Sequence, residues 1–496
     1  MSDFGFLLAV VILIPIAAAT LPLIASLRYE KVGWHIAAVS LAVNLVLTAV
    51  AVRAFFVDGK LRHELGGIPV PHGIELVMDG LSVLVVLLVS VVALAVLVHT
   101  RTAGPRSNAF YSAYLLLTGG LLGVSLTGDL FNLYVFIEIT GLAAYALIAS
   151  KGDGKSAYSA LKYMLIGTVG ASLYLIGVGY AFIATGTLNM VDLSVQFQEL
   201  GYGDTLVLTS FGFIIAGLAV KTALFPVHTW QPDAYSAAPY GVAGYVSALV
   251  STVSAYVIGR VILTVYTTDF IAANPVITSA LVYFGALSIV VGSVLAVTQA
   301  DVKKMLAYSS VSQFGMIVAA FGIANSAAVF GGVIQLIGHA IMKGALFLGA
   351  GILAYKVGAK TVYDYEGISF ELPYASAGFA TLALALVGVP PAVGFIGKWY
   401  VGLGAVQGGY WIVAVVIFGS TLLTLAYVLR LVDRMYFGKP ERGAAEAVAD
   451  GGVSASTKRV TVGMVALVCV AAVVSVVLGP SAAWIESLLR LEEVMG

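Results

Sequence analysis

Residues 206–240, LVLTSFGFIIAGLAVKTALFPVHTWQPDAYSAAPY, combine a membrane-type helix with charged and helix-breaking residues. The first part is apolar except for Lys221, and Phe225-Pro226 interrupts the helix four residues later. A lysine near the middle of a bilayer costs about 2.5–3.5 kcal/mol on insertion scales, and a proline removes a backbone donor. Such a helix persists only where protein or water satisfies the freed groups. The stretch therefore predicts a membrane protein that moves protons or small cations.

The composition of the whole chain agrees with this prediction. Of 496 residues, 60% are hydrophobic and 10% are charged, and the mean hydropathy is +1.02, whereas soluble domains carry about 25% charged residues. The net charge of zero, without a long basic patch, argues against nucleic acid as a partner. The single Cys469 excludes a disulfide framework and cysteine-based metal clusters. We find no nucleotide motif, metal cluster or nucleophile constellation, so we expect no cofactor, no metal and no enzyme chemistry.

Apolar runs of about 20 residues cross a bilayer, and their number predicts an all-α polytopic membrane protein. The N-terminal run lacks a positive leader, so it is expected to be a retained helix. We predict about fourteen spans, at 4–26, 33–57, 79–100, 109–127, 130–150, 161–186, 206–231, 239–267, 274–298, 305–324, 328–356, 372–400, 410–437 and 460–480.

The lysines and arginines predict the orientation of these spans. Loops after even-numbered spans and the C-terminal tail hold only Arg53, Lys60, Arg62 and Arg490. By the positive-inside rule, loops after odd-numbered spans are cytoplasmic, both termini lie outside, and the chain is a multi-pass protein of a prokaryotic cell membrane. These cytoplasmic loops hold 17 of the 25 basic residues: Arg28, Lys31, Arg101, Arg106, Lys151, Lys155, Lys162, Lys303, Lys304, Lys356, Lys360, Arg430, Arg434, Lys439, Arg442, Lys458 and Arg459.

Four basic residues, Lys221, Arg260, Lys343 and Lys398, fall within predicted spans, where Glu138 is the acidic counterpart. We expect Arg260 to snorkel or to pair with Asp269.

The helix that carries Glu138 begins at an outside turn. Asp129 is expected to cap that helix, which places Glu138 about 13 Å deeper in the membrane. Asn132 lies about two turns outward of Glu138. Glu138 and Lys221 form the obvious ion pair; the alternative is a neutral glutamate that bonds neighbouring helices together.

Two further helices carry rows of polar residues. Ser247, Ser251 and Ser254 lie at i, i+4 and i+7 with Thr252 beside them, so their hydroxyls would line one face and hold waters. Alternatively, each serine bonds only its own backbone.

In span 328–356, Gln335, His339 and Lys343 lie at i, i+4 and i+8 on one face. This row indicates a proton relay; the alternative is a structural membrane histidine.

A second broken span carries Pro390-Pro391 and then Lys398. Two interrupted spans at corresponding places in two halves indicate an inverted-repeat transporter core. We predict repeats at 109–268 (spans 4–8) and 269–437 (spans 9–13), and the odd number of spans makes them inverted. N-terminal helices at 1–108 precede them, and a cytoplasmic loop with the last helix at 438–496 follows.

Five motifs together resemble the antiporter-like subunits shared by Mrp-type sodium/proton antiporters, membrane-bound hydrogenases and respiratory complex I. This resemblance covers nearly the whole chain and is greatest to D-type Mrp subunits and their hydrogenase counterparts. The motifs are GDLFNLYVFIEI, KTALFPVHTWQPDAYSAAP, DVKKMLAYSSVSQFG, HAIMKGALF and GVPPAVGFIGKW.

The resemblance implies a proton-conducting subunit of a hetero-oligomeric membrane complex, with protons and Na⁺ as transported ions. It implies that Lys221 switches its proton affinity as its pair with Glu138 opens and closes. Protons would then pass along waters to His339 and Lys343 and on to Lys398, with polar groups such as His228 in support. Many members have a lysine where this chain has Thr252, so here the middle of the path must rest on water and hydroxyls, or on span 328–356.

Two other functions fit the same residues. The chain could be the pump module of a redox-driven complex, in which a partner enzyme energises the same path. It could also be a membrane scaffold whose buried charges only hold helices together.

Overall fold

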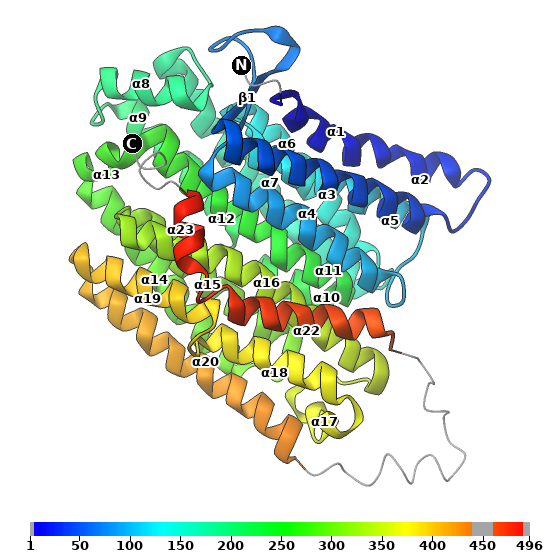
Figure 1. The fold of residues 1–496 in the computed structure, drawn as a ribbon. Coiled ribbons are helices and arrows are strands. Elements are labelled where there is room, and N and C mark those ends of the chain that lie inside the picture. The colour runs from blue at the N-terminus through cyan, green and yellow to red at the C-terminus, as the bar shows by residue number, and fades with distance from the viewer. Residues whose placement is uncertain (1–3, 439–459, 490–496) are drawn as a thin grey trace, which may run out of the picture.

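The computed structural model describes residues 4–438 and 460–489, which form a bundle of long helices (Figure 1). Within the described residues, twelve helices are long and apolar enough to cross a membrane. They are α1–α2 (Phe6–Ala18 and Thr20–Ala25), α3 (Gly33–Asp58), α4 (Gly80–Thr100), α5 (Asn108–Leu126), α6 (Leu130–Ala149), α7 (Gly154–Thr185), α9 (Thr205–Thr222), the continuous helix Tyr240–Ala273, α14 (Pro275–Thr298), α15 (Val302–Ile323), α16 (Ser326–Val357) and α20 (Trp411–Phe437).

The remaining predicted spans are divided. α18 (Pro373–Val387) and α19 (Val393–Gln407) meet at the Pro390-Pro391 break, and each is shorter than a full span. α22 (Val462–Val477) and α23 (Ala482–Leu489) are bent by 79° and give a thirteenth span if counted together. The polytopic helical fold is confirmed, with one short β-hairpin beside the helices, while the count of fourteen stays a prediction. The predicted loop residues Lys439, Arg442, Lys458 and Arg459, and Arg490 in the tail, lie outside the described residues.

Short elements join the long helices. α8 (Met190–Leu200) follows α7, α10 (Trp230–Ala237) follows the first break, and η4 (Val362–Tyr365) with α17 (Ile368–Glu371) follows α16. β1 (Leu61–Glu64) and β2 (Glu75–Met78), joined through η1 (Leu65–Gly67), pair antiparallel with Leu61 opposite Met78. The loop between α3 and α4 therefore contains a short β-hairpin.

Side-chain caps explain where several of the long helices begin. Aspartate accepts hydrogen bonds from the free N–H groups of a first turn. Asp129 caps α6 through the N–H of Asn132, as predicted, and Asp301 caps α15 through the N–H of Lys304. The short polar turns between spans therefore define helix ends as well as connecting them.

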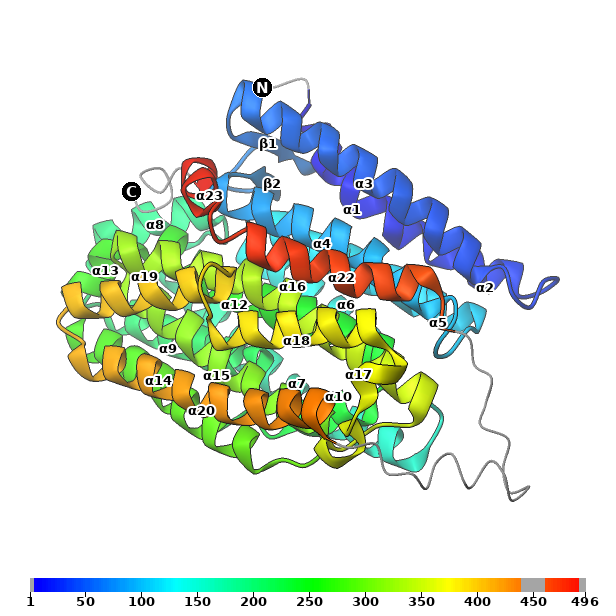
Figure 2. The same cartoon turned by 60° about the horizontal axis from the view of Figure 1, so that its bottom comes forward.

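The polar residues of α15, α16 and Tyr240–Ala273 lie on the most enclosed helices. About 94% of the spanning window is buried in α15 and in α16, and 89% in Tyr240–Ala273, against 33% in α3 and 39% in α20. Figure 2 shows α15 and α16 inside the bundle, with α3 at one margin and α20 at another. Polar groups on the enclosed helices are therefore shielded from lipid by protein.

The helix Tyr240–Ala273 is not regular. Its segments are α11 (Tyr240–Tyr245), the π-helical η2 (Val246–Val250), α12 (Ser251–Arg260), the π-helical η3 (Val261–Tyr266) and α13 (Thr267–Ala273). π segments interrupt the regular hydrogen-bond ladder and are frequent at functional sites. The i, i+4, i+7 spacing of Ser247, Ser251 and Ser254 therefore does not give one straight stripe.

Arg260 corrects the sequence prediction. It neither snorkels nor pairs with Asp269; its guanidinium binds the carboxylate of Asp79, the N-cap residue of α4. Both side chains are mostly buried, and Asp269 is exposed. The partner that helix packing brings close lies 181 residues away, so sequence proximity to Asp269 was misleading.

We expect Arg260→Met to lower the free energy of unfolding by about 3–5 kcal/mol, because it leaves the Asp79 carboxylate buried without its cation. The double variant Asp79→Asn/Arg260→Met should recover much of this loss. Unfolding of the purified complex measures the effect, with exposed Arg53→Met as the control. Equal stability of the Arg260 and Arg53 variants would contradict the prediction.

Candidate functional site

The predicted ion pair between Glu138 and Lys221 is present. Lys221 Nζ donates to Glu138 Oε1 at 2.9 Å, joining α9 to α6. The lysine side chain is 6% exposed and the glutamate 26% exposed. The lysine is therefore enclosed, whereas the glutamate side chain is partly exposed at the surface of the chain.

The glutamate belongs to an outward face of α6. Phe131, Val135 and Leu142 are exposed on the same face, at spacings of seven, three and four residues from Glu138. A carboxylate on an otherwise apolar membrane surface is costly unless another group covers it. In the isolated chain, this face of α6 therefore lacks a group that covers the Glu138 carboxylate.

Tyr145 completes the surroundings of Lys221 and was missed in the sequence. It lies seven residues after Glu138, which places it on the same face of α6. A Cβ added at Gly141 would lie 3.0 Å from the Tyr145 hydroxyl and 3.6 Å from Lys221 Nζ. A Cβ at Gly167 of α7 would lie 2.3 Å from the same hydroxyl. The two glycines thus make room for the phenol beside the amine.

We expect Gly167→Ala to destabilise the protein by about 1–3 kcal/mol, because its methyl group overlaps the Tyr145 hydroxyl. Tyr145→Phe in the same chain should restore most of the loss, which a double-mutant cycle on unfolding detects. Gly179→Ala, on the same helix with nothing within 4 Å, is the matched control. A loss that Tyr145→Phe leaves unchanged would refute this packing.

The break after α9 is satisfied by protein groups, as its sequence required. The Phe225 N–H donates to Ser288 Oγ at 2.7 Å, and the Trp230 indole donates to the Val220 carbonyl at 2.9 Å. His228 is buried at the break, with its ring beside those of Phe225 and Tyr308. Specific side-chain contacts therefore hold the helix break next to Lys221.

The serines expected to form one stripe have different surroundings. Ser251 bonds Gln231 at 3.0 Å and Tyr235 at 2.9 Å, two residues of α10 that sequence reasoning missed. Ser254 donates to the Val250 carbonyl of its own helix, yet it also lines a cavity of about 20 Å³ together with Lys221. Such a cavity has room for about one water molecule.

Two hydroxyls of this helix remain available for water. Within the described part of the chain, the buried Ser247 and Thr252 hydroxyls have no hydrogen-bond partner. Ser247 lies next to Ala248, which packs against Gly344 of α16, the neighbour of Lys343. These hydroxyls therefore lie on the helix that touches the second group of charged residues.

Asn132 belongs to the corner where α6 begins. Its side-chain amide donates to Thr127 Oγ1 at 2.9 Å, and its backbone N–H donates to the Asp129 carboxylate that caps α6. The structure thus gives Asn132 a role in the turn and does not place it at the ion pair.

The second group lies on α16. Lys343 Nζ donates to the Leu306 carbonyl at 2.8 Å and to Ser309 Oγ, both on α15. The Gln335 amide donates to Gln313, also on α15. All of these acceptors are neutral oxygens, and no carboxylate pairs with Lys343 among the described residues.

His339 lies between these two residues along the helix. Its ring packs 4.6 Å from the ring of Phe314, and both ring nitrogens are buried without a hydrogen-bond partner in the described residues. Unpaired buried nitrogens are unusual and call for a water or a functional role.

Lys398 binds the end of the helix that precedes the second break. Its Nζ donates to the Val387 carbonyl at 2.7 Å and to the Leu386 carbonyl at 3.1 Å, at the end of α18. A cation at a helix C-terminus is favoured by the free carbonyls and the helix dipole. Lys221 likewise lies in the last turn of α9. Both breaks therefore place a lysine at the C-terminus of the preceding helix.

A polytopic helical bundle with two broken helices and buried lysines beside them defines a class of ion-translocating membrane proteins. The chain belongs to the family described as NADH:quinone oxidoreductase/Mrp antiporter, TM, whose model matches residues 127–424. The resemblance seen in the five sequence motifs is confirmed.

Subunits of an NADH-quinone oxidoreductase and of a Na⁺/H⁺ antiporter both match most of the chain. The N subunit of the NADH-quinone oxidoreductase of Desulforudis audaxviator (strain MP104C) is 40% identical over 447 residues, covering 88% of this chain and 87% of that protein. The D subunit of the Na⁺/H⁺ antiporter of Bacillus subtilis (strain 168) is 32% identical over 402 residues, covering 80% of each. A chain in the membrane-bound sulfane sulfur reductase, an archaeal respiratory membrane complex, superposes with TM-score 0.88 at 27% identity, covering 98% of this chain and 97% of that one.

Proposed function

We propose that this chain is a proton-translocating subunit of a multisubunit Na⁺/H⁺ antiporter, and thus a transporter subunit and not an enzyme. The observation that carries the proposal is the Glu138–Lys221 ion pair, 2.9 Å long, on membrane-spanning helices beside a break. The similarity to the Na⁺/H⁺ antiporter protein of B. subtilis supports the assignment.

The chemistry of the pair explains how a proton would move. A carboxylate beside a buried ammonium group stabilises its charge, so separation of the two favours release of the proton. The released proton would pass by the cavity shared with Ser254 and by water on Ser247 and Thr252 to Lys343, with His339 beside it. Lys398 would complete the path. Water and hydroxyls replace the lysine that many family members carry at the position of Thr252.

We also propose that residues 109–268 and 269–437 are inverted repeats, preceded by 1–108 and followed by 438–496. Leu130 N–H bonds the Leu188 carbonyl, and 172 positions further along Val302 N–H bonds the Lys360 carbonyl. The bridges Asp129–Asn189 and Asp301–Thr361 keep the same offset. α7 and α16 each have 32 residues, and they begin 172 positions apart.

The positions of the neighbouring elements support inversion. α8, which follows the first of these junctions, and α17, which follows the second, lie at opposite ends of the bundle (Figures 1 and 2). Two copies of one unit that place the same junction at opposite ends have opposite orientations in a membrane.

Other subunits are the proposed partners. The outward α6 face with Glu138 needs a cover that is not hydrocarbon, because an exposed carboxylate is costly in lipid. The membership of related chains in membrane complexes supports the same inference. The basic loops support termini outside the cell membrane, which labelling of single cysteines in a Cys469→Ala chain can test.

A redox-driven proton pump module is the second candidate. The observation that favours it is the 40% identity to an NADH-quinone oxidoreductase subunit, higher than the identity to the antiporter protein of B. subtilis. The buried ion pair would have the same role, but a partner enzyme would supply the energy.

Vesicles that contain the complete complex distinguish the two candidates. An imposed Na⁺ gradient should change the internal pH without any electron donor if the complex is an antiporter. A pH change that requires an electron donor and does not respond to Na⁺ would instead support the redox-driven pump. Neighbouring genes give a rapid check, since antiporter subunits alone favour the first candidate and quinone-reductase or hydrogenase subunits favour the second.

A further inference from the structure

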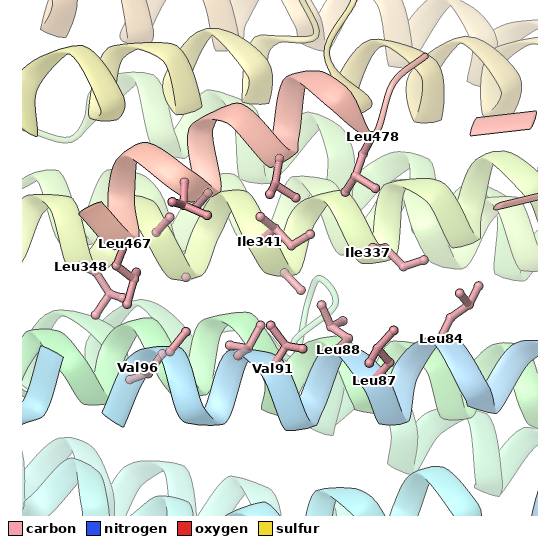
Figure 3. Close-up of a pocket in the computed structure, with 18 of the residues that line it drawn as sticks. Leu84, Leu87, Leu88, Val91, Val96, Ile337, Ile341, Leu348, Leu467 and Leu478 are labelled. Carbon is pink, nitrogen blue, oxygen red and sulfur yellow. The ribbon is translucent and has the colours of Figure 1, made fainter. Parts of the chain in front are cut away.

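A long apolar groove lies on the opposite side of α16 from the enclosed polar residues, between α4, α16, α22 and α23. Its volume is about 330 Å³, and all twenty lining residues are apolar. Figure 3 shows Leu88 and Val91 of α4 facing Ile337 and Ile341 of α16 across this space, with Leu467 of α22 at its margin.

The groove is bounded at both ends and open in its middle. A Cβ on Gly463 of α22 would lie 3.6 Å from Val98 of α4, so these helices touch at one end. At the other end, Leu489 of α23 packs its backbone against Gly80 of α4. Between these contacts, Val91 and Val470 are 45% and 60% exposed. Entry is therefore lateral, from the interior of the membrane.

The length and the width of the groove limit what can occupy it. The lining of α4 runs from Leu84 to Val96, about 18 Å at 1.5 Å per residue. This lining is centred on Ser90, the middle residue of α4 (Gly80–Thr100), so the groove lies at the middle of the ~30 Å hydrocarbon core, where acyl chains end. A volume of about 330 Å³ spread over this length is too narrow for a helix about 10–12 Å across.

The groove is unfavourable both for water and as an empty space. Apolar cavities do not hold water because they offer it no hydrogen-bond partners. A dry cavity of about 150 Å³ already binds small apolar molecules, and this groove is about twice as large and opens into lipid. Filling it restores van der Waals contacts for every lining side chain.

We propose that the groove between α4, α16, α22 and α23 is a binding site for one acyl chain of a membrane phospholipid. The chain enters between Val91 and Val470 and lies along α16 beside Ala340, Ala345 and Leu348. These three residues are 0%, 4% and 1% exposed. The site needs only a membrane-spanning protein and does not depend on which ion the complex carries.

Photolabelling of the intact complex tests the site. Vesicles of phosphatidylcholine would contain a fraction of the same lipid with a diazirine in the middle of one acyl chain. After irradiation and digestion, we expect labels on the α16 segment 337–348 as well as on exposed faces such as that of α14. Labels on α14 with none on 337–348 would overturn the proposal and leave the groove to a partner's side chain.

Variants that fill the groove make the test specific. Ala471→Phe projects a ring into the groove, and labelling of 337–348 relative to α14 should fall about fivefold because the volume is taken. Val91→Trp at the groove mouth is a second variant in case the first does not assemble. Ala280→Phe on the exposed face of α14 is the matched control and should leave labelling of 337–348 unchanged. Equal labelling in all three variants would exclude an acyl chain in the groove.

Discussion

Lys221→Met is expected to abolish Na⁺-driven proton movement in vesicles that contain the complete complex. Its amine is the only cation in the described residues that is paired with Glu138, and it lies at the break between α9 and α10. Without it, no group at this point can alternate between a charged, paired state and a state that has released its proton. We expect the rate to fall about a hundredfold or more, as when an essential proton carrier is removed.

Two controls separate transport from assembly. Glu138→Gln should also stop transport, because the neutral amide no longer stabilises the ammonium charge. Exposed Lys31→Met, which removes a charge far from the pair, should leave transport unchanged. The scaffold hypothesis predicts the opposite pattern, in which Glu138→Gln transports normally while the complex loses stability.

Lys343→Met is expected to stop transport as completely as Lys221→Met but to leave the complex at least as stable. The reason is the difference between their partners. Among the residues that the structure describes, Lys343 donates only to the neutral oxygens of Leu306 and Ser309, so its removal leaves no unpaired charge. Removal of Lys221 leaves the Glu138 carboxylate without its cation on a membrane-spanning helix, which is costly in the assembled complex.

Transport and thermal unfolding of the same purified complexes check this contrast. Lys343→Met should unfold at or above the temperature of the unmodified complex, and Lys221→Met below it. The double variant Glu138→Gln/Lys221→Met should regain stability without regaining transport. Normal transport by Lys343→Met would remove α16 from the proposed pathway.

Much of the fold was predictable because its signals are local. Apolar runs, the two proline breaks and the Asp129 cap each depend on residues close together in sequence. The pair of Glu138 with Lys221 was predictable because Glu138 is the one acidic residue deep in a predicted span. Tyr145 was also within reach, since it shares a helix face with Glu138.

Other parts of the site depended on contacts that no local pattern contains. Arg260 had a nearby candidate in Asp269 and binds Asp79 instead. The serine spacing assumed a regular helix, but η2 changes the registration of Ser247 relative to Ser251. Asn132, about two turns outward of Glu138, bonds Thr127 in the turn before α6.

The sequence by itself determined that this is a helical membrane protein of the antiporter-like family, with lysines beside two broken helices. Hydropathy and helix breaking are properties of consecutive residues, so they can be read without a structure. The tertiary structure decided which groups those lysines contact: a carboxylate for Lys221, and neutral oxygens for Lys343 and Lys398. These contacts depend on the rotation and spacing of helices far apart in sequence, which packing alone sets.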